Sequence, residues 1–227
     1  MTDEPRIDEV IDFANNPEPR CACVLLLDTS GSMQGAPIDA LNDGLQKFKD
    51  DLIKDDLASR RVEIAVVAFN SQVDVVQDFV TADKFNPPTL IAQGSTFMGT
   101  AITKALDMIR DRKQRYKDNG ISYFRPWVFM ITDGEPQGEP AYIIEQASKR
   151  VKQEDADKRV AFFAVGVENA NMARLQNIVS PARPPVKLIG LNFVEMFLWL
   201  SRSAQAVSHS KLDDVQVALP PPGWGTV

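Results

Sequence analysis

Short runs of consecutive apolar residues alternate along this chain with longer stretches in which apolar residues recur every three or four positions. The runs predict strands buried on both faces, at residues 24–27, 62–69, 127–131, 160–167 and, more briefly, 186–188. The periodic stretches predict amphipathic helices, which begin near residues 37, 100, 143, 171 and 193. This alternation is typical of a doubly wound α/β fold, with a mostly parallel central sheet and helices on both faces.

One predicted strand departs from the parallel pattern. Residues 73–79 include polar positions that suggest half-exposure, and only Asn70–Gln72 separate them from the preceding strand. A connection this short joins antiparallel neighbours in a hairpin. We therefore expect one antiparallel strand at an edge of the sheet.

The length of 227 residues and the hydrophobic content of 44% predict one globular domain with short extensions. We assign residues 1–18 to a polar N-terminal lead-in, 19–210 to the domain and 211–227 to an extended C-terminal tail. The tail carries Pro220–Pro222, and Trp224 is its candidate anchor to the domain.

Composition narrows the function classes. A net charge of −6 argues against nucleic acid or an anionic membrane as the main partner. The chain begins without the basic and apolar segments of a secretory signal, and its longest late apolar stretch is too short to cross a bilayer, so we expect a cytoplasmic protein. Cys21 and Cys23 are poorly spaced for a disulfide, and a single histidine leaves too few donors for zinc, so we expect two buried thiols.

The first buried run ends in a carboxylate, Asp28, followed by hydroxyls at Ser30 and Ser32. Side chains at alternate positions share one side of extended backbone, so these three oxygen donors can converge. Such donors suit Mg²⁺ or Mn²⁺ rather than zinc. The same residue types also cap turns into helices, so this stretch alone leaves both interpretations open.

A second buried strand ends in a similar way, at Thr132-Asp133-Gly134. Doubly wound sheets bind ligands at the carboxyl ends of strands, where the strand order reverses. If the two strands are neighbours, Asp28 and Asp133 meet over one site. The loop Gly94–Gly99 can then deliver Thr96 as a further oxygen donor.

Together, Asp28-Thr29-Ser30-Gly31-Ser32, the loop threonine and Thr132-Asp133-Gly134 resemble the metal-ion-dependent adhesion site of von Willebrand factor A (VWA) domains. The resemblance covers nearly the whole chain and implies a Rossmann-like fold. It implies a divalent-metal site, with Mg²⁺ expected and Mn²⁺ or Ca²⁺ as alternatives, formed by Asp28, Ser30, Ser32, Thr96 and Asp133. It also implies a protein-binding module, in which an Asp or Glu of the partner completes the metal coordination. We expect no enzymatic activity, because the sequence shows no pairing of a base with a nucleophile.

Finer features resemble the bacterial TerY-type branch of this family, which is associated with tellurite resistance. They are Pro37-Ile38, Gly94-Ser95-Thr96 and Arg125-Pro126-Trp127, although Ser95 stands where we expect glycine in that branch. The resemblance implies association with a Ser/Thr protein kinase and a PP2C-type phosphatase, or with other stress-response proteins.

Two other classes stay open at this point. A Mg²⁺-dependent phosphotransfer enzyme or phosphatase could use Asp28 as phosphoryl acceptor, but Ser30 stands where haloacid-dehalogenase-like phosphatases carry a second aspartate. The loop Gly94–Thr100 also lacks the lysine of a phosphate-binding loop, and His209, the only histidine, is expected in an exposed linker. The other class is a scaffold that binds partners without metal.

Overall fold

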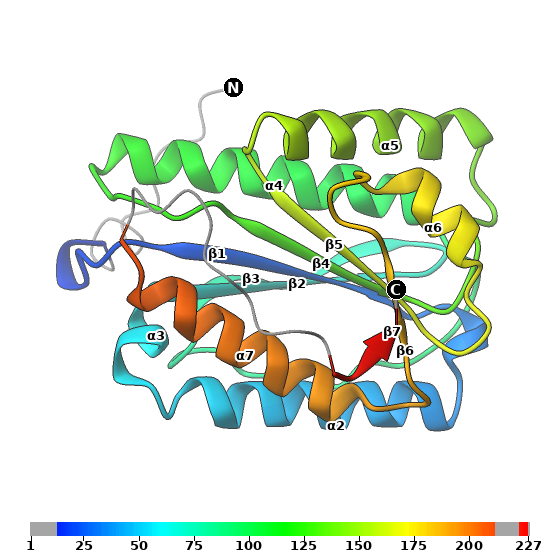
Figure 1. Ribbon diagram of the computed structural model, residues 1–227, viewed down its shortest axis with the longest axis horizontal. Coiled ribbons are helices and arrows are strands. Elements are labelled where there is room, and N and C mark those ends of the chain that lie inside the picture. The colour runs from blue at the N-terminus through cyan, green and yellow to red at the C-terminus, as the bar shows by residue number, and fades with distance from the viewer. Residues whose placement is uncertain (1–12, 212–222, 227) are drawn as a thin grey trace.

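The computed structural model describes residues 13–211 and 223–226 (Figure 1). They form a seven-stranded sheet with the strand order β3-β2-β1-β4-β5-β6-β7. The five inner strands, β2, β1, β4, β5 and β6, run parallel to one another. The strands are β1 (Cys21–Asp28), β2 (Val62–Phe69), β3 (Val73–Thr81), β4 (Trp127–Thr132), β5 (Ala161–Gly166), β6 (Val186–Leu188) and β7 (Gly225–Thr226).

Helices cover both faces of the sheet, as Figure 1 shows. One layer contains α2 (Ala36–Leu52), α3 (Asp56–Arg61) and α7 (Phe193–His209). The other contains α4 (Met98–Asp118), α5 (Ala141–Ala156) and α6 (Met172–Ile178). The predicted doubly wound α/β fold with a mostly parallel sheet is confirmed.

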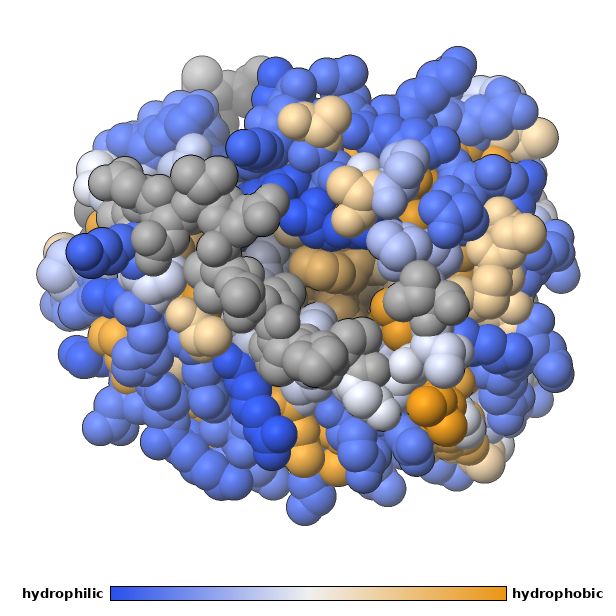
Figure 2. Space-filling model, viewed as in Figure 1, coloured by the Kyte–Doolittle hydropathy of each residue, from blue (hydrophilic) through white to orange (hydrophobic). Residues whose placement is uncertain are grey.

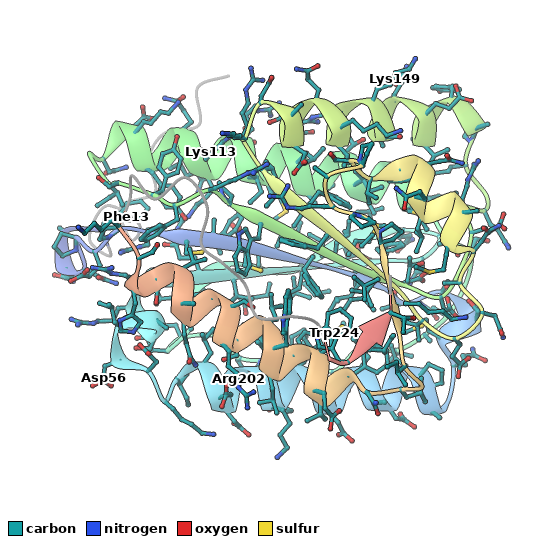
Figure 3. The ribbon with its side chains drawn as sticks, viewed as in Figure 1. Phe13, Asp56, Lys113, Lys149, Arg202 and Trp224 are labelled. Carbon is teal, nitrogen blue, oxygen red and sulfur yellow. The ribbon has the colours of Figure 1, made fainter. Side chains whose placement is uncertain are left out.

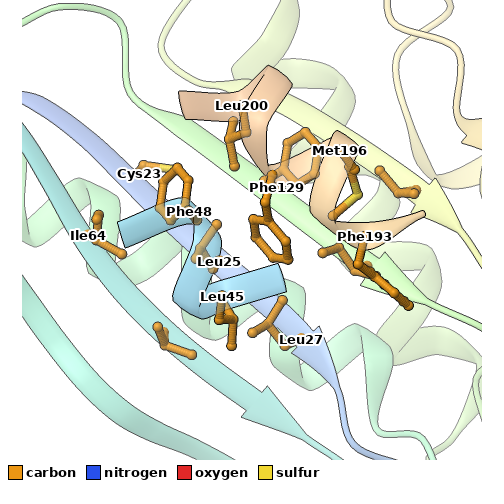
Figure 4. Packing of buried hydrophobic residues seen from close by; sticks show 14 of the residues in the cluster. Cys23, Leu25, Leu27, Leu45, Phe48, Ile64, Phe129, Phe193, Met196 and Leu200 are labelled. Carbon is orange, nitrogen blue, oxygen red and sulfur yellow. The ribbon is translucent and has the colours of Figure 1, made fainter. Parts of the chain in front are cut away.

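The central strand β1 explains why its sequence shows no alternation. Cys21, Cys23, Leu25 and Leu27 pack in the core beneath α2 and α7, which Figure 4 shows from close by. The intervening side chains, Ala22, Val24 and Leu26, pack in the second core beneath α4 and α5. Both cysteines are buried and free, as predicted, and burial raises the pKa of the Cys21 thiol to about 12.

The sheet has antiparallel strands at both edges. The predicted one is β3, which pairs with β2. The other, β7, lies in the C-terminal tail, pairs with β6 and was not predicted, because two residues carry no hydrophobic periodicity. Next to it lies Trp224, which is buried and is labelled in Figure 3. Its ring packs edge to face on that of Trp199, with 5.5 Å between the ring centroids.

The prediction for His209 was wrong in one respect. It forms the last residue of α7 rather than part of a linker, because apolar residues continue along one face of that helix as far as Val207. Its Nε2 lies 2.8 Å from Oδ2 of Asp55, which caps the short helix α3 that the sequence did not reveal. No helix in the part of the chain that the structure describes is long and apolar enough to cross a bilayer.

Residues 1–12 of the predicted lead-in and 212–222 and 227 of the predicted tail lie outside the described residues. The proposed domain boundaries therefore stay predictions.

Candidate metal centre

The two strand-terminal carboxylates come from neighbouring strands. β1 and β4 pair in parallel, with Leu27 opposite Ile131, so Asp28 and Asp133 follow at the same edge of the sheet. The strand order reverses here, since β2 and β3 continue on one side of β1 and β4 and β5 on the other. The candidate site therefore occupies the switch point at which doubly wound sheets bind ligands.

Asp28 is the most buried group of the site, with no solvent-exposed surface. Its Oδ1 accepts a hydrogen bond from the backbone N–H of Ser30 at 2.8 Å, and its Oδ2 accepts one from Oγ1 of Thr132 at 2.5 Å. Burial raises the pKa of Asp28 to about 6, against the lowering effect of these hydrogen bonds. The carboxylate receives only neutral donors from the described residues, so its negative charge lacks a positive partner in the protein.

A chain of hydroxyls connects Asp28 to Asp133. The Ser30 and Ser32 hydroxyl oxygens are 3.1 Å apart, and Oγ of Ser32 donates to Oδ1 of Asp133 at 2.9 Å. Burial raises the pKa of Asp133 above its usual value, the Ser32 hydrogen bond lowers it, and the negative charge of Glu168 raises it further. By contrast, Oγ1 of Thr29 donates to the carbonyl of Phe69, away from the site. Only alternate hydroxyls of the loop therefore face the candidate centre.

Thr96 enters from the loop that precedes α4. Its backbone pairs with that of Gln137 through two hydrogen bonds, of 3.3 and 3.0 Å. A carbon atom placed at the missing Cβ of Gly134 would lie 3.5 Å from Oγ1 of Thr96, 3.8 Å from Oδ2 of Asp28 and 3.9 Å from Oγ of Ser32. Three oxygen atoms from two separate segments, the end of β1 with the loop after it and the loop before α4, thus face one small space beside Gly134, which a side chain at position 134 would fill.

The loops that carry these oxygens are tied to one another through the backbone. Gly31 donates its N–H to the carbonyl of Gly94 at 2.9 Å, and Gln93 donates to that of Thr29 at 2.7 Å. Gly94 has a φ of +75°, whereas Ser95 does not lie in the left-handed region. The backbone therefore needs glycine at position 94 and tolerates serine at position 95.

Two residues that support the site were missed. Thr132 had one signal in the sequence, a hydroxyl directly before Asp133, but its bond to Asp28 depends on the neighbouring strand. Glu139 had none: it caps the N-terminus of α4, accepting from the N–H groups of Gly99 and Thr100 at 2.5 and 3.1 Å. This cap fixes the start of the helix that follows Thr96.

The donor set restricts the chemistry. Within the described residues, no group of three or more His, Cys, Asp and Glu side chains gathers at one place. The cluster instead combines two carboxylates with three hydroxyls, a set that fits a hard, oxygen-preferring cation better than zinc. The small space at Gly134 and the uncompensated charge of Asp28 also fit a bound cation.

The fold and the cluster define a Rossmann-like α/β domain with an oxygen-lined site at its switch point. The family model of the von Willebrand factor type A domain matches residues 23–189, and the chain belongs to this family. Its domains commonly mediate protein–protein interactions.

Solved structures share the fold at low sequence identity. A von Willebrand factor type A protein from Catenulispora acidiphila is similar with a TM-score of 0.62 and 15% identity, over 83% of this chain and 43% of that one. The pilus adhesin SpaC from Lactobacillus rhamnosus GG has a TM-score of 0.62 and 14% identity, over 84% of this chain and 31% of that one. The vWF domain of the type V pili tip protein Mfa5 from Porphyromonas gingivalis has a TM-score of 0.62 and 10% identity, over 87% of this chain and 99% of that one. This chain therefore spans less than half the length of the first two proteins. The search of curated protein sequences found no match to this chain.

Proposed function

We propose that this chain is a metal-ion-dependent protein-binding module, in which an acidic side chain of the partner completes the coordination of a divalent cation. The observation that carries the proposal is the convergence of oxygen atoms from Asp28, Ser32 and Thr96 on the space beside Gly134. Ser30 and Asp133 join the set through their contacts with Ser32. We propose Mg²⁺ as the ion, with Mn²⁺ or Ca²⁺ as alternatives.

The buried charge of Asp28 favours this proposal. A buried carboxylate that receives only neutral donors is costly, and a divalent cation beside it would offset that cost. When bound, the ion would act as a Lewis acid toward an incoming oxygen ligand. Five protein oxygens leave at least one position of an octahedral ion open, and a carboxylate of the partner suits that position.

The biological setting is a further part of the proposal. Similarity to the TerY-type branch suggests a cytoplasmic stress-response or tellurite-resistance system. A Ser/Thr kinase and a PP2C-type phosphatase are then the proposed partners, and the module itself has no catalytic role. Two features of the sequence speak against catalysis. Ser30 stands where haloacid-dehalogenase-like phosphatases carry a second aspartate, and the loop Gly94–Thr100 lacks the lysine of a phosphate-binding loop.

Calorimetric titration of metal-stripped protein with Mg²⁺ and with Mn²⁺ tests the metal site. We expect saturable binding to one site, which Asp28→Ala abolishes. Asp43→Ala is the matched control, because Asp43 is an exposed aspartate on α2 outside the cluster, and its loss should leave binding unchanged. Binding that survives in Asp28→Ala, or no binding by the wild type, would contradict the proposed site.

Partner binding is tested separately, with the purified kinase and phosphatase as candidates. Affinity for a true partner should fall in excess chelator and in Asp28→Ala, while circular dichroism shows that the variant stays folded. Equal affinity with and without metal would instead support a metal-independent scaffold.

A further inference from the structure

Large apolar side chains are exposed at the same edge of the sheet as the candidate metal centre. Of the described residues, Ile91 has the most exposed large apolar side chain, at 76%, and Tyr142 follows at 58%. Both lie in segments that flank the metal-site loops: Tyr142 in the first turn of α5, which begins at the right of Figure 1, and Ile91 in the loop before Thr96. In the same view, Figure 2 shows apolar residues among the polar ones along that side.

Ile91 lies in a loop that is held against the segment carrying Ser30 and Ser32. Its neighbour Ala92 accepts a hydrogen bond from the side chain of Gln34 at 3.2 Å. Leu90, on the other side, donates its N–H to Oδ1 of Asn42 at 2.9 Å. The loop therefore holds Ile91 outward at a fixed place, although an exposed isoleucine adds nothing to the core.

Tyr142 reaches Thr96 through a different segment from Ile91. It belongs to the first turn of α5, five residues after Gln137, whose backbone pairs with Thr96. Ile91 precedes Thr96 by the same number of residues. Five residues of extended chain span at most about 17 Å, so Ile91 lies within that distance of Thr96 and Tyr142 within that distance of Gln137. Both side chains are therefore within reach of a short peptide whose carboxylate meets the site.

The charges around the site narrow the choice of ligand. Glu135 and Glu168 are exposed on the loops after β4 and β5, close to Asp133, and the chain carries a net charge of −6. A run of acidic residues would be repelled here, whereas a single carboxylate with uncharged neighbours would not.

We infer that the partner segment carries one Asp or Glu with a bulky apolar residue within about five positions, and that this apolar residue packs on Ile91. The inference rests on the proposed function, because the acidic residue is the one that completes the metal site. Apolar contacts of this kind commonly dominate binding energy at the centre of an interface.

A random peptide library displayed on phage provides the probe. Peptides are selected on the wild-type protein in Mg²⁺ and eluted with chelator. We expect the eluted peptides to share a single acidic residue and a bulky apolar residue at nearby positions. Individual synthetic peptides from this pool are then titrated in Mg²⁺ against the wild type and two serine variants.

Ile91→Ser should lower the affinity for these peptides by roughly tenfold or more, while the affinity for Mg²⁺ stays unchanged. The matched control is Ile53→Ser, because Ile53 is also an exposed isoleucine, at 40%, but follows the far end of α2. We expect this control to bind peptides as the wild type does.

The possible failures are distinguishable. Peptides that share an acidic residue without apolar preference, or affinities that Ile91→Ser leaves unchanged, would overturn the inference and leave the proposed function standing. A selection without chelator-eluted peptides, or peptides that bind Asp28→Ala equally well, would overturn both.

Discussion

Two buried carboxylates lie near opposite ends of the paired strands β1 and β2, and the protein treats them differently. Glu63, at the start of β2, accepts hydrogen bonds from Nε of Arg20 at 2.9 Å, Nε of Arg112 at 2.7 Å and the hydroxyl of Tyr116 at 2.5 Å. Asp28, at the end of β1, accepts hydrogen bonds only from neutral groups within the described part of the chain, namely the backbone N–H and hydroxyl of Ser30 and the hydroxyl of Thr132.

The difference separates a structural charge from a charge that needs a ligand. Two guanidinium groups offset the charge of Glu63 within the protein, and both also lie over the ring of Phe13, at 5.6 and 5.0 Å. Asp28 has no such cation among the described residues, and its pKa of about 6 reflects the cost of its burial. We therefore assign Glu63 to stability and Asp28 to binding, and the following experiments test this assignment.

The largest effect is expected from Glu63→Ala. The substitution leaves Arg20 and Arg112 buried without their carboxylate partner, which typically costs about 3–5 kcal/mol of stability. Urea denaturation measures the loss. In the fraction that stays folded, Mg²⁺ affinity should match the wild type, and a selective loss of metal binding would break the distinction between the two carboxylates.

Asp28→Asn should stabilise the metal-free protein, in contrast to Glu63→Ala. In metal-free protein the buried charge of Asp28 costs about 3 kcal/mol at most at neutral pH, since its pKa rises by about two units from 3.8 to about 6. Removing the charge should raise the free energy of unfolding by up to that amount and abolish Mg²⁺ binding.

The same comparison has a pH dependence with a defined sign. Because the folded-state pKa of Asp28 is raised, the contribution of Asp28 to wild-type stability decreases as the pH rises from about 4 to about 6 and is constant above. The advantage of Asp28→Asn should therefore shrink as the pH falls through this range. Urea denaturation of both proteins in chelator at several pH values measures this advantage. A difference in the free energy of unfolding that does not change with pH would show that the buried charge of Asp28 is not its cause.

Thr132→Val should cost about 2 kcal/mol, because it removes a hydroxyl that donates to the buried charge of Asp28 and keeps the side-chain shape. Mg²⁺ binding should weaken as well. Thr29→Val is the matched control, since the Thr29 hydroxyl donates to the Phe69 carbonyl instead, and its metal affinity should remain that of the wild type. Equal losses of metal affinity in both variants would count against the role of Thr132.

The smallest effect concerns proton competition at the site. Mg²⁺ binding needs ionised Asp28 and Asp133, and both have a raised pKa in the metal-free protein. The affinity should be constant near neutral pH and fall below about pH 6, by up to about tenfold per pH unit for each of the two carboxylates that becomes protonated. Titrations over this pH range measure it, and an affinity that is flat down to pH 4 would exclude Asp28 as a ligand.

Local patterns were sufficient to predict most of the fold and the members of the candidate site. Buried strands such as β4 are apolar, here from Trp127 to Ile131, because both faces are covered, and this is visible without any knowledge of their neighbours. Asp28, Ser30, Ser32 and Asp133 were predicted because strand ends and alternate positions restrict where side chains point, whereas Thr96 was added from the intervening loop and from the resemblance to VWA domains.

Pairings over long distances in the chain were decided only in three dimensions. The bond from Thr132 to Asp28, the cap that Glu139 forms on α4 and the bonds from two arginines to Glu63 join residues 40 to 104 positions apart. Strand β7 has two residues and no periodicity of its own. Its place is set by the β6 edge and the buried ring of Trp224. A sequence pattern reports on burial along one segment, whereas the partner of a polar group depends on which segments the folded sheet brings together.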